Sequence, residues 1–272
     1  MNLENHFISQ FSNSHIGDDG AVLNGYVYSK DAFFENVHFK KDWLSYKQIA
    51  KKAMLVNISD AVAMNAQPKY ALLSVAMPKS MSKKDMEELA DGFKEVANEY
   101  DITIIGGDTI SNTKLDITIT IIAKTKKALL RSKIRAGYML GHTGKLGKSA
   151  KELKKLFNLG TIHTKSKFID IKLRRDFMRR TERFLQAGMD ISDGLFSDLD
   201  KITTLNRIGI KFNKNVSKKI ACSGEEYEML VAFDKRDVKA MKRRSTQSRT
   251  PLNIFGTATR SKYTNRCKAH HF

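Results

Sequence analysis

Proline, cysteine and tryptophan are scarce in this sequence of 272 residues, which contains 3, 2 and 1 of them. With so little proline and no low-complexity tract, the chain has no compositional sign of disorder. No apolar run approaches the roughly 20 residues that span a bilayer, so we expect no membrane-spanning segment. Cys222 and Cys267 lie far apart and form no C-x-x-C pair, which argues against a disulfide framework or a zinc site, so we expect two free thiols.

Acidic residues are also few, 29 against 48 lysines and arginines, and the formal net charge is +19. Such an excess of positive charge is typical of proteins that bind nucleic acids. The basic residues are spread along the chain, however, and no motif that reads bases accompanies them. We therefore expect a solvated basic surface with no specific nucleic-acid partner, and we keep a basic nucleic-acid-binding protein as the non-enzyme alternative.

The N-terminus lacks the basic start and the apolar stretch of roughly 7–15 residues that mark a secretory signal, so we expect a cytoplasmic protein. Hydrophobic residues make up 41% of the sequence, which is enough for a sizeable core. The length suits one large domain or two ordinary ones.

Strands and helices alternate in the first half of the chain, which indicates an α/β (α+β) fold. Residues 26–29, 70–77 and 116–121 have the composition or the two-residue period of strands. A helix is expected after Ser82, because Ser82 and Asp85 have capping-box spacing and apolar residues then recur every three or four positions up to Tyr100. Another helix is expected over residues 46–66, before Pro68.

A polar break at residues 124–127 is the expected domain boundary, which divides the chain into residues 1–126 and 127–272. The second half repeats the mixed pattern. Helices are expected near residues 150–157, 174–186, 195–205 and 235–244, and strands near 208–212 and 227–233.

Several aspartates stand beside glycine or serine, at the ends of expected elements, where the backbone can turn tightly. The segments are Gly17-Asp18-Asp19-Gly20, Ser29-Lys30-Asp31, Asn57-Ile58-Ser59-Asp60, Gly106-Gly107-Asp108-Thr109 and Asp190-Ile191-Ser192-Asp193-Gly194. Carboxylates are hard oxygen ligands of the kind that hold Mg²⁺ beside a phosphate. A like-charged pair costs on the order of 4 kcal/mol at ~4 Å and an effective dielectric constant of ~20, so a true cluster implies a bound metal or raised pKa values.

A second candidate phosphate site is the glycine-rich segment 141–149, which follows a short strand-like run and precedes a helix. Its spacing departs from the G-x-x-x-x-G-K-S pattern, because position 142 is His142 and the glycine stands one residue earlier. A bulged phosphate loop remains an alternative here.

Taken in order, these motifs resemble those of the thiamine-monophosphate kinase family, in the aminoimidazole ribonucleotide synthetase superfamily. The resemblance runs from residue 16 to about residue 233 and also includes Glu35-Asn36-Val37-His38-Phe39 and Gly224-Glu225-Glu226-Tyr227-Glu228. It implies transfer of the γ-phosphoryl group of ATP to thiamine monophosphate, assisted by several Mg²⁺ ions. It also implies a two-domain fold in which residues 1–126 bind ATP and Mg²⁺, and in which the N-terminal strands of two copies form a dimer barrel.

The resemblance assigns roles by position in these motifs. Metal binding falls on Asp19, Ser29, Asp31, Asp60, Asp108, Asp190 and Asp193. ATP binding falls on Gly107, Asp108, Arg131 and Ser192, substrate binding on His38 and Glu225, and catalysis on Asp19, Asp60, Asp190 and Arg131. For His38, the alternative is a histidine that only supports the fold.

The sequence departs from the family pattern at several positions. Lys30 stands where a further side-chain metal ligand is common, Glu226 replaces an aspartate, and Ala269 occupies the expected position of an aromatic residue that stacks on the substrate. A second enzymatic alternative is therefore another ATP-using member of the superfamily, with a different acceptor.

Overall fold

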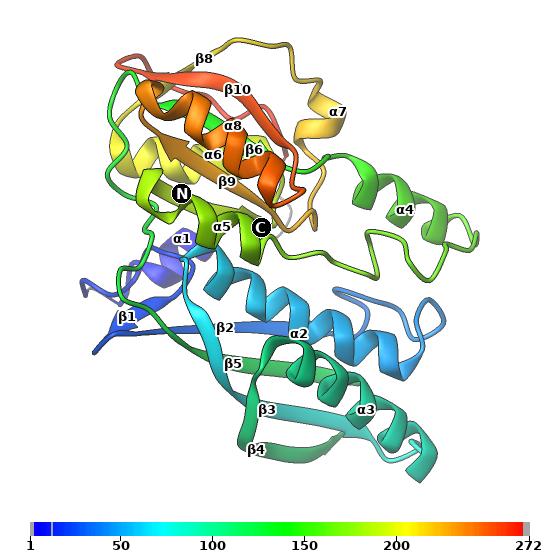
Figure 1. Cartoon of the computed structure of the whole chain (residues 1–272). Helices are drawn as coiled ribbons and strands as arrows, with labels where there is room; N and C mark the ends of the chain where they lie inside the picture. The colour runs from blue at the N-terminus through cyan, green and yellow to red at the C-terminus, as the bar shows by residue number, and fades with distance from the viewer. Residues whose placement is uncertain (1–2, 12, 269–272) are drawn as a thin grey trace. The chain divides into compact units, whose positions relative to one another are not determined.

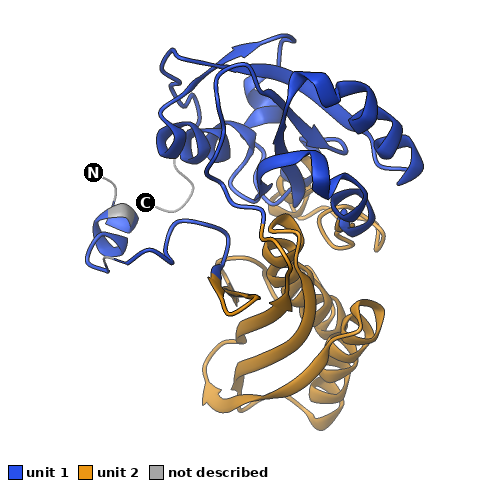
Figure 2. Cartoon of the chain, turned by 60° about the vertical axis from the view of Figure 1, so that its left-hand side comes forward, with its two compact units in different colours: residues 1–21, 129–150, 174–272 blue, residues 22–128, 151–173 orange. Residues whose placement is uncertain are grey.

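The computed structural model describes residues 3–11 and 13–268. The chain forms two compact units, coloured separately in Figure 2. Unit 1 contains residues 1–21, 129–150 and 174–272, and unit 2 contains residues 22–128 and 151–173. These units differ from the expected segments 1–126 and 127–272, because each unit is built from separate stretches of chain. The assignment of ATP binding and dimerisation to residues 1–126 stays a prediction.

Unit 2 contains a five-stranded sheet with the strand order β1-β2-β5-β3-β4. The strands are β1 (Ala21–Leu23), β2 (Tyr26–Phe34), β3 (Gln67–Pro78), β4 (Thr103–Asn112) and β5 (Asp116–Lys124). The β2–β5 and β5–β3 pairs are antiparallel, and β3–β4 is parallel. The strands expected at 26–29, 70–77 and 116–121 are thus confirmed and extended.

Helices α2 (Tyr46–Ala63) and α3 (Lys83–Tyr100) lie along one face of this sheet (Figure 1). The capping box expected at Ser82 and Asp85 is present, and α2 begins with a second capping box at Ser45 and Gln48. Gly92 lets the two helices approach closely, because a Cβ atom there would lie 2.4 Å from the carbonyl oxygen of Lys47. Helix α2 contacts β5, in which Ile117, Ile119 and Ile121 are buried.

Unit 1 contains an antiparallel five-stranded sheet with the order β7-β9-β6-β10-β8. The strands are β6 (Met139–Thr143), β7 (Leu185–Ile191), β8 (Gly209–Phe212), β9 (Glu228–Phe233) and β10 (Leu252–Thr259). Helix α6 (Leu195–Asn206) packs on it, with Leu195 and Leu199 buried in one cluster with Met189 and Leu230.

The remaining helices are shorter and are labelled in Figure 1 where there is room. They are α1 (Leu3–Ile8), α4 (Lys148–Phe157), α5 (Arg175–Thr181), η1 (Glu182–Phe184), α7 (Lys218–Ala221), η2 (Lys235–Asp237) and α8 (Val238–Gln247). Helices α5 and α8 contact each other, and α8 also contacts β10. No helix in the described ranges has the length and apolar character needed to cross a membrane.

Two sequence-based assignments in unit 1 need correction. The helix expected over 174–186 ends earlier, because residues 185 and 186 begin β7. Strand β7 is buried almost throughout, so its residues show no alternation, and a short apolar run of this kind does not distinguish helix from strand. Strand β10 was not expected at all.

The expectation of two free thiols is wrong. Cys222 and Cys267 form a disulfide bond with their Cα atoms 5.6 Å apart, although 45 residues separate them in the sequence. Cys222 follows α7 directly, and Cys267 lies near the end of the described chain. The C-terminal segment is also held by Tyr263, whose hydroxyl donates to the carbonyl of Phe196 at 3.0 Å. The segment from Tyr263 to Cys267 is thereby held at both ends to the part of the chain that contains α6 and α7.

We predict that reducing this disulfide lowers the free energy of unfolding by about 4 kcal/mol, because a cross-link over 45 residues restricts the unfolded chain. Urea unfolding followed by circular dichroism, with and without dithiothreitol, measures the difference. The double variant Cys222→Ala/Cys267→Ala serves as the control, since the reductant should not change its stability. Equal stability of the oxidised and reduced wild-type protein would contradict the prediction.

Candidate active site

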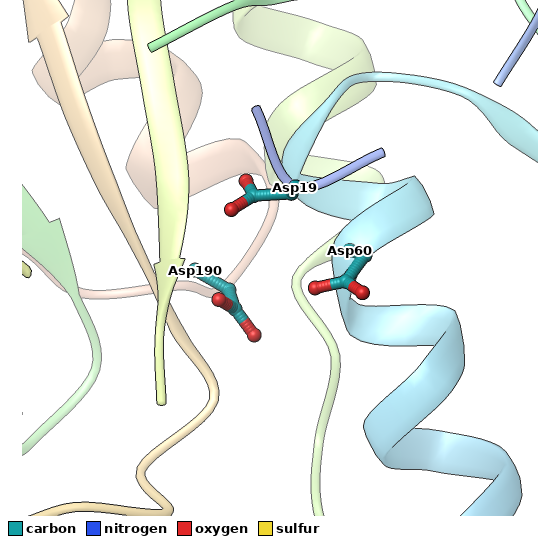
Figure 3. A group of neighbouring side chains, drawn as sticks. All are labelled: Asp19, Asp60 and Asp190. Atoms are coloured by element: carbon teal, nitrogen blue, oxygen red, sulfur yellow. The ribbon is translucent and has the colours of Figure 1, made fainter. Parts of the chain in front are cut away.

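Two of the expected catalytic aspartates come together in unit 1. Asp190 lies at the end of β7, and Asp19 lies in the loop that precedes β1 (Figure 3). One carboxylate oxygen of each lies within 4.8 Å of the other, and their burial is nearly complete, with Asp190 3% exposed and the Asp19 side chain 1% exposed. Because two buried carboxylates at this distance repel each other, the site requires positive charge.

Arg131 supplies part of that charge. Its side chain makes an ion pair with Asp19, in which Nε donates to Oδ1 at 3.0 Å and a terminal nitrogen donates to the same oxygen. Its backbone N–H donates to Asp18 at 2.6 Å, and its carbonyl accepts from Asn206 at 2.9 Å. The loop that carries Arg131 is thus held from both sides, by the Asp18 loop and by the last residue of α6.

The second oxygen of Asp19, Oδ2, is buried and has no hydrogen-bond partner among the described residues. Burial raises the pKa of Asp19 above its ordinary value, and Arg131 opposes this rise. For Arg131, burial lowers the pKa, but the carboxylates of Asp19, Asp190 and Asp198 together raise it. An unpaired carboxylate oxygen beside a second carboxylate fits a hard divalent cation. The donor set in unit 1 is therefore suited to Mg²⁺.

The turn from β7 into α6 positions Asp193. Gly194 is the N-cap of α6 with φ of 96°, and a Cβ atom at this position would lie 3.0 Å from the carbonyl of Ala221. The Asp193 N–H donates to Asp198 at 3.2 Å, and the ammonium of Lys201 lies 2.6 Å from the Asp193 carboxylate. Burial raises the pKa of Asp198 to about 7, even though Lys201 lowers it.

Ser192 and Glu225 are also neighbours through the backbone. The Glu225 N–H donates to the Ser192 carbonyl at 2.7 Å, and Glu225 has a φ of 55°. The expected ATP-binding and substrate-binding loops therefore meet at the end of β7.

The glycine-rich segment 141–149 does not present its amides as an open anion site. The N–H groups of Gly147 and Ser149 donate to Oε1 of the buried Glu226, at 2.7 and 3.2 Å. The chain's own carboxylate thus takes the place that a phosphate has in a phosphate loop. The departure at Glu226 has a structural role, because it joins the loop after β6 to the loop before β9.

In unit 2, Asn57 connects the segment Ser29-Lys30-Asp31 to the helix that carries Asp60. This residue is fully buried in α2, where its side chain accepts from the Asp31 N–H at 2.8 Å, and its carbonyl accepts from Ser29 Oγ at 3.3 Å. Asp60 follows one turn later on the same helix and is labelled in Figure 3. Ser29, Asp31 and the helix that carries Asp60 therefore form one connected group.

Asp108 lies elsewhere in the sheet of unit 2. It belongs to the edge strand β4, whereas Asp31 belongs to β2, and β5 and β3 lie between them. Three strand spacings of ~4.8 Å separate the two residues, so they cannot bind the same ion within one chain. Gly107 is required at its position, because a Cβ atom there would lie 1.6 Å from the carbonyl oxygen of Leu73.

His38 is half-buried beside β2. Its Nδ1 accepts from the Phe34 N–H at 2.9 Å, and its ring stacks on Phe33 with centroids 5.6 Å apart. These contacts fix the orientation of the ring, and substrate binding by His38 stays a prediction. Lys30 donates to Thr118 Oγ1 at 3.3 Å across the sheet. Ala269 lies outside the described residues.

Sequence reasoning missed four residues that support the site: Asn57, Asp198, Lys201 and Asn206. Asn57 stood within a quoted motif but was given no role. Asp198 and Lys201 follow Asp193 by five and eight residues on the helix, which is the only sequence feature that connects them to it.

Comparison with known proteins shows which family and which relatives this chain resembles. Residues 17–125 match the family described as AIR synthase related protein, N-terminal domain. The chain is 33% identical to the thiamine-monophosphate kinase of Buchnera aphidicola subsp. Schizaphis graminum, over 83% of this chain and 78% of that protein. It is 31% identical to the enzyme of the same name from Buchnera aphidicola subsp. Acyrthosiphon pisum, over 84% and 79%.

A solved structure described as "AaThiL complexed with AMPPCP and TMP" superposes with a TM-score of 0.87 at 22% identity, covering 99% of this chain and 96% of that chain. At this identity the likeness concerns the fold. It confirms the expected α/β (α+β) fold, while the dimer barrel stays a prediction.

We predict that Arg131→Met lowers the free energy of unfolding by about 3 kcal/mol, because it removes the cation that forms an ion pair with the buried Asp19. Urea unfolding at neutral pH measures the loss. The double variant Asp19→Asn/Arg131→Met removes both charges and should recover part of the stability. A single variant as stable as the wild type would show that Asp19 does not depend on Arg131.

Proposed function

The chain belongs to the thiamine-monophosphate kinase family, and from this premise we propose that it transfers the terminal phosphoryl group of ATP to thiamine monophosphate, yielding thiamine diphosphate and ADP. The observation that carries the proposal is the buried pair Asp19 and Asp190, because a cation-binding carboxylate pair suits the transfer of phosphoryl groups.

The chemistry of the acceptor suits a site rich in aspartate. A phosphate monoester has a second pKa near ~6, so its oxygen is largely ionised at neutral pH and needs no strong general base. The main obstacle is repulsion between two anionic substrates. Positioning and positive charge therefore supply most of the catalysis.

We propose that Asp19, Asp190 and Asp193 are Mg²⁺ ligands in unit 1, and that Ser29, Asp31, Asp60 and Asp108 are Mg²⁺ ligands in unit 2. Bound Mg²⁺ would neutralise the phosphate oxygens of both substrates. The support comes from the unpartnered Oδ2 atom of Asp19 and from the distance of at most 4.8 Å between one carboxylate oxygen of Asp19 and one of Asp190. In unit 2 it comes from the attachment of Ser29 and Asp31 to α2 through Asn57.

Arg131 has two tasks in this proposal. It orients Asp19, and its guanidinium adds a fixed positive charge that offsets the phosphoryl charge of ATP. The backbone at Gly107 and the Ser192 hydroxyl complete the ATP site, and His38 and Glu225 contact thiamine monophosphate. The fixed orientation of the His38 ring supports such a contact, because its Nδ1 accepts from the backbone and its Nε2 is therefore the nitrogen that carries the proton.

The proposed reaction predicts that Asp60→Asn reduces the formation of thiamine diphosphate more than about 100-fold, because it removes one ligand charge from the metal site. The measurement is chromatographic detection of thiamine diphosphate after incubation with ATP, Mg²⁺ and thiamine monophosphate. Asp101→Asn is the matched control, since Asp101 is exposed and pairs with Lys69 at the surface of unit 2. Full activity of Asp60→Asn, or a wild-type yield no higher than that of a metal-free control, would contradict the proposal.

We also propose that the protein is a homodimer joined through the sheet of unit 2. The sheet exposes large apolar side chains that solvent-facing strands rarely carry: Tyr28, Tyr70, Leu72, Ile105 and Ile110. Ile110 is 57% exposed, and β4 is an open edge. In such a dimer, Asp108 of one copy would serve the site of the other, which its distance from Asp31 within one chain supports.

If this face joins two copies, Leu72→Lys converts the dimer to a monomer, because it places a charge in an apolar contact. Light scattering at micromolar concentration measures the mass. Leu205→Lys is the control, since Leu205 is an exposed leucine on α6 of unit 1. A monomeric wild-type protein would exclude this assembly.

The cytoplasm stays the predicted location. Stable disulfides are uncommon in that compartment, and those that occur there are often transient, so the Cys222–Cys267 bond is the feature to examine in cells.

A further inference from the structure

The ammonium group of Lys201 lies beside the Asp193 carboxylate, at the place where a metal ion bound to Asp193 would lie. Its ammonium lies 2.6 Å from Oδ2 of Asp193 and 3.0 Å from Oδ1 of Asp198. The side chain belongs to α6, two turns after the loop that carries Asp193. A lysine held between two carboxylates of one site is a fixed positive charge within the aspartate cluster.

The second carboxylate keeps the ammonium in place. Asp198 is fully buried, lies three residues before Lys201 on the helix, and accepts the Asp193 N–H through its other oxygen at 3.2 Å. The same residue therefore orients the Asp193 backbone and anchors the lysine that binds the Asp193 side chain. All three residues belong to the turn after β7 and to the helix α6 that follows it.

We propose that Lys201 is a built-in cation that occupies a ligand oxygen of Asp193 and thereby competes with a divalent ion for this carboxylate. The inference rests on the proposed function, because it takes Asp193 to be a metal ligand. A divalent ion bound to the same oxygen would lie close to the ammonium, and two cations at short range repel each other. The chain therefore binds divalent ions at Asp193 more weakly than its carboxylates alone would allow.

The competition with Lys201 affects metal binding at Asp193 and not at Asp19 and Asp190. The ammonium of Lys201 bonds directly to Asp193 and Asp198, whereas the cation bonded to Asp19 is Arg131. An ion at Asp19 and Asp190 therefore does not have to displace Lys201. The Asp193 position takes up an ion only when the negative charge of bound substrate outweighs the ammonium. Because of Lys201, the metal position at Asp19 and Asp190 fills without substrate, whereas the metal position at Asp193 fills only when substrate is bound.

The experiment uses a pair of changes that leaves the net charge constant. Lys201→Met alone would leave the buried Asp198 without its counter-charge, so the test variant is Lys201→Met/Asp198→Asn, in which the new amide oxygen can still accept the Asp193 N–H. Lys69→Met/Asp101→Asn is the matched control, because it removes an exposed ion pair of 2.9 Å in unit 2. Mn²⁺ binding to each full-length protein is measured by equilibrium dialysis without nucleotide.

The test variant should bind an additional Mn²⁺ ion, or bind Mn²⁺ roughly tenfold or more tightly, whereas the control pair and Lys201→Arg should match the wild type. Unchanged or weaker binding by the test variant, with Mn²⁺ bound normally by the wild type, would overturn the inference and leave the proposed function intact. Absence of Mn²⁺ binding in every protein would overturn the metal site itself and this inference with it. If circular dichroism shows that the test variant is unfolded, Lys201→Gln/Asp198→Asn replaces it, with the same expected result.

Discussion

Repulsion between buried carboxylates is the constraint on which this site depends. Asp19 and Asp190 lie too close together, and too far from water, to remain ionised without nearby positive charge. The chain provides some of that charge itself, through Arg131 at Asp19 and Lys201 at Asp193. The protein therefore balances its buried carboxylates in part with fixed side-chain cations, and its net charge of +19 is a separate property of the whole chain.

Polar residues that touch neither substrate in the proposed reaction keep these charges in place. Asn57 joins β2 to α2, and Asn206 holds the carbonyl of Arg131. Glu226 fills the cradle of amides after β6 and so ties two loops of unit 1 together. Each of these groups is a buried or half-buried hydrogen-bonding side chain whose loss would leave backbone groups unsatisfied. The precision of the site therefore depends on residues outside the acidic motifs.

Much of the fold could be predicted from local patterns. Ser82 and Asp85 marked the start of α3, and the alternation at residues 116–121 marked β5, because capping and pleating depend on neighbours within a few residues. Strand β7 was partly assigned to a helix, since burial on both faces removed its alternation. The carboxylate groups were found as motifs, but Asp198 and Lys201 were not, because helix positions with acidic and basic residues normally face solvent.

The sequence by itself determined the order of the aspartate motifs, the alternation of helices and strands, and through them the family. The tertiary structure alone decided which charges meet. Arg131 reaches Asp19 across 112 residues, Glu226 reaches Gly147 across 79, and Cys222 bonds Cys267 across 45. No local period encodes such contacts, because they arise only when separate segments pack into the same core. For that reason the sequence identified the candidate ligands, and the folded chain identified the cations that balance their charge.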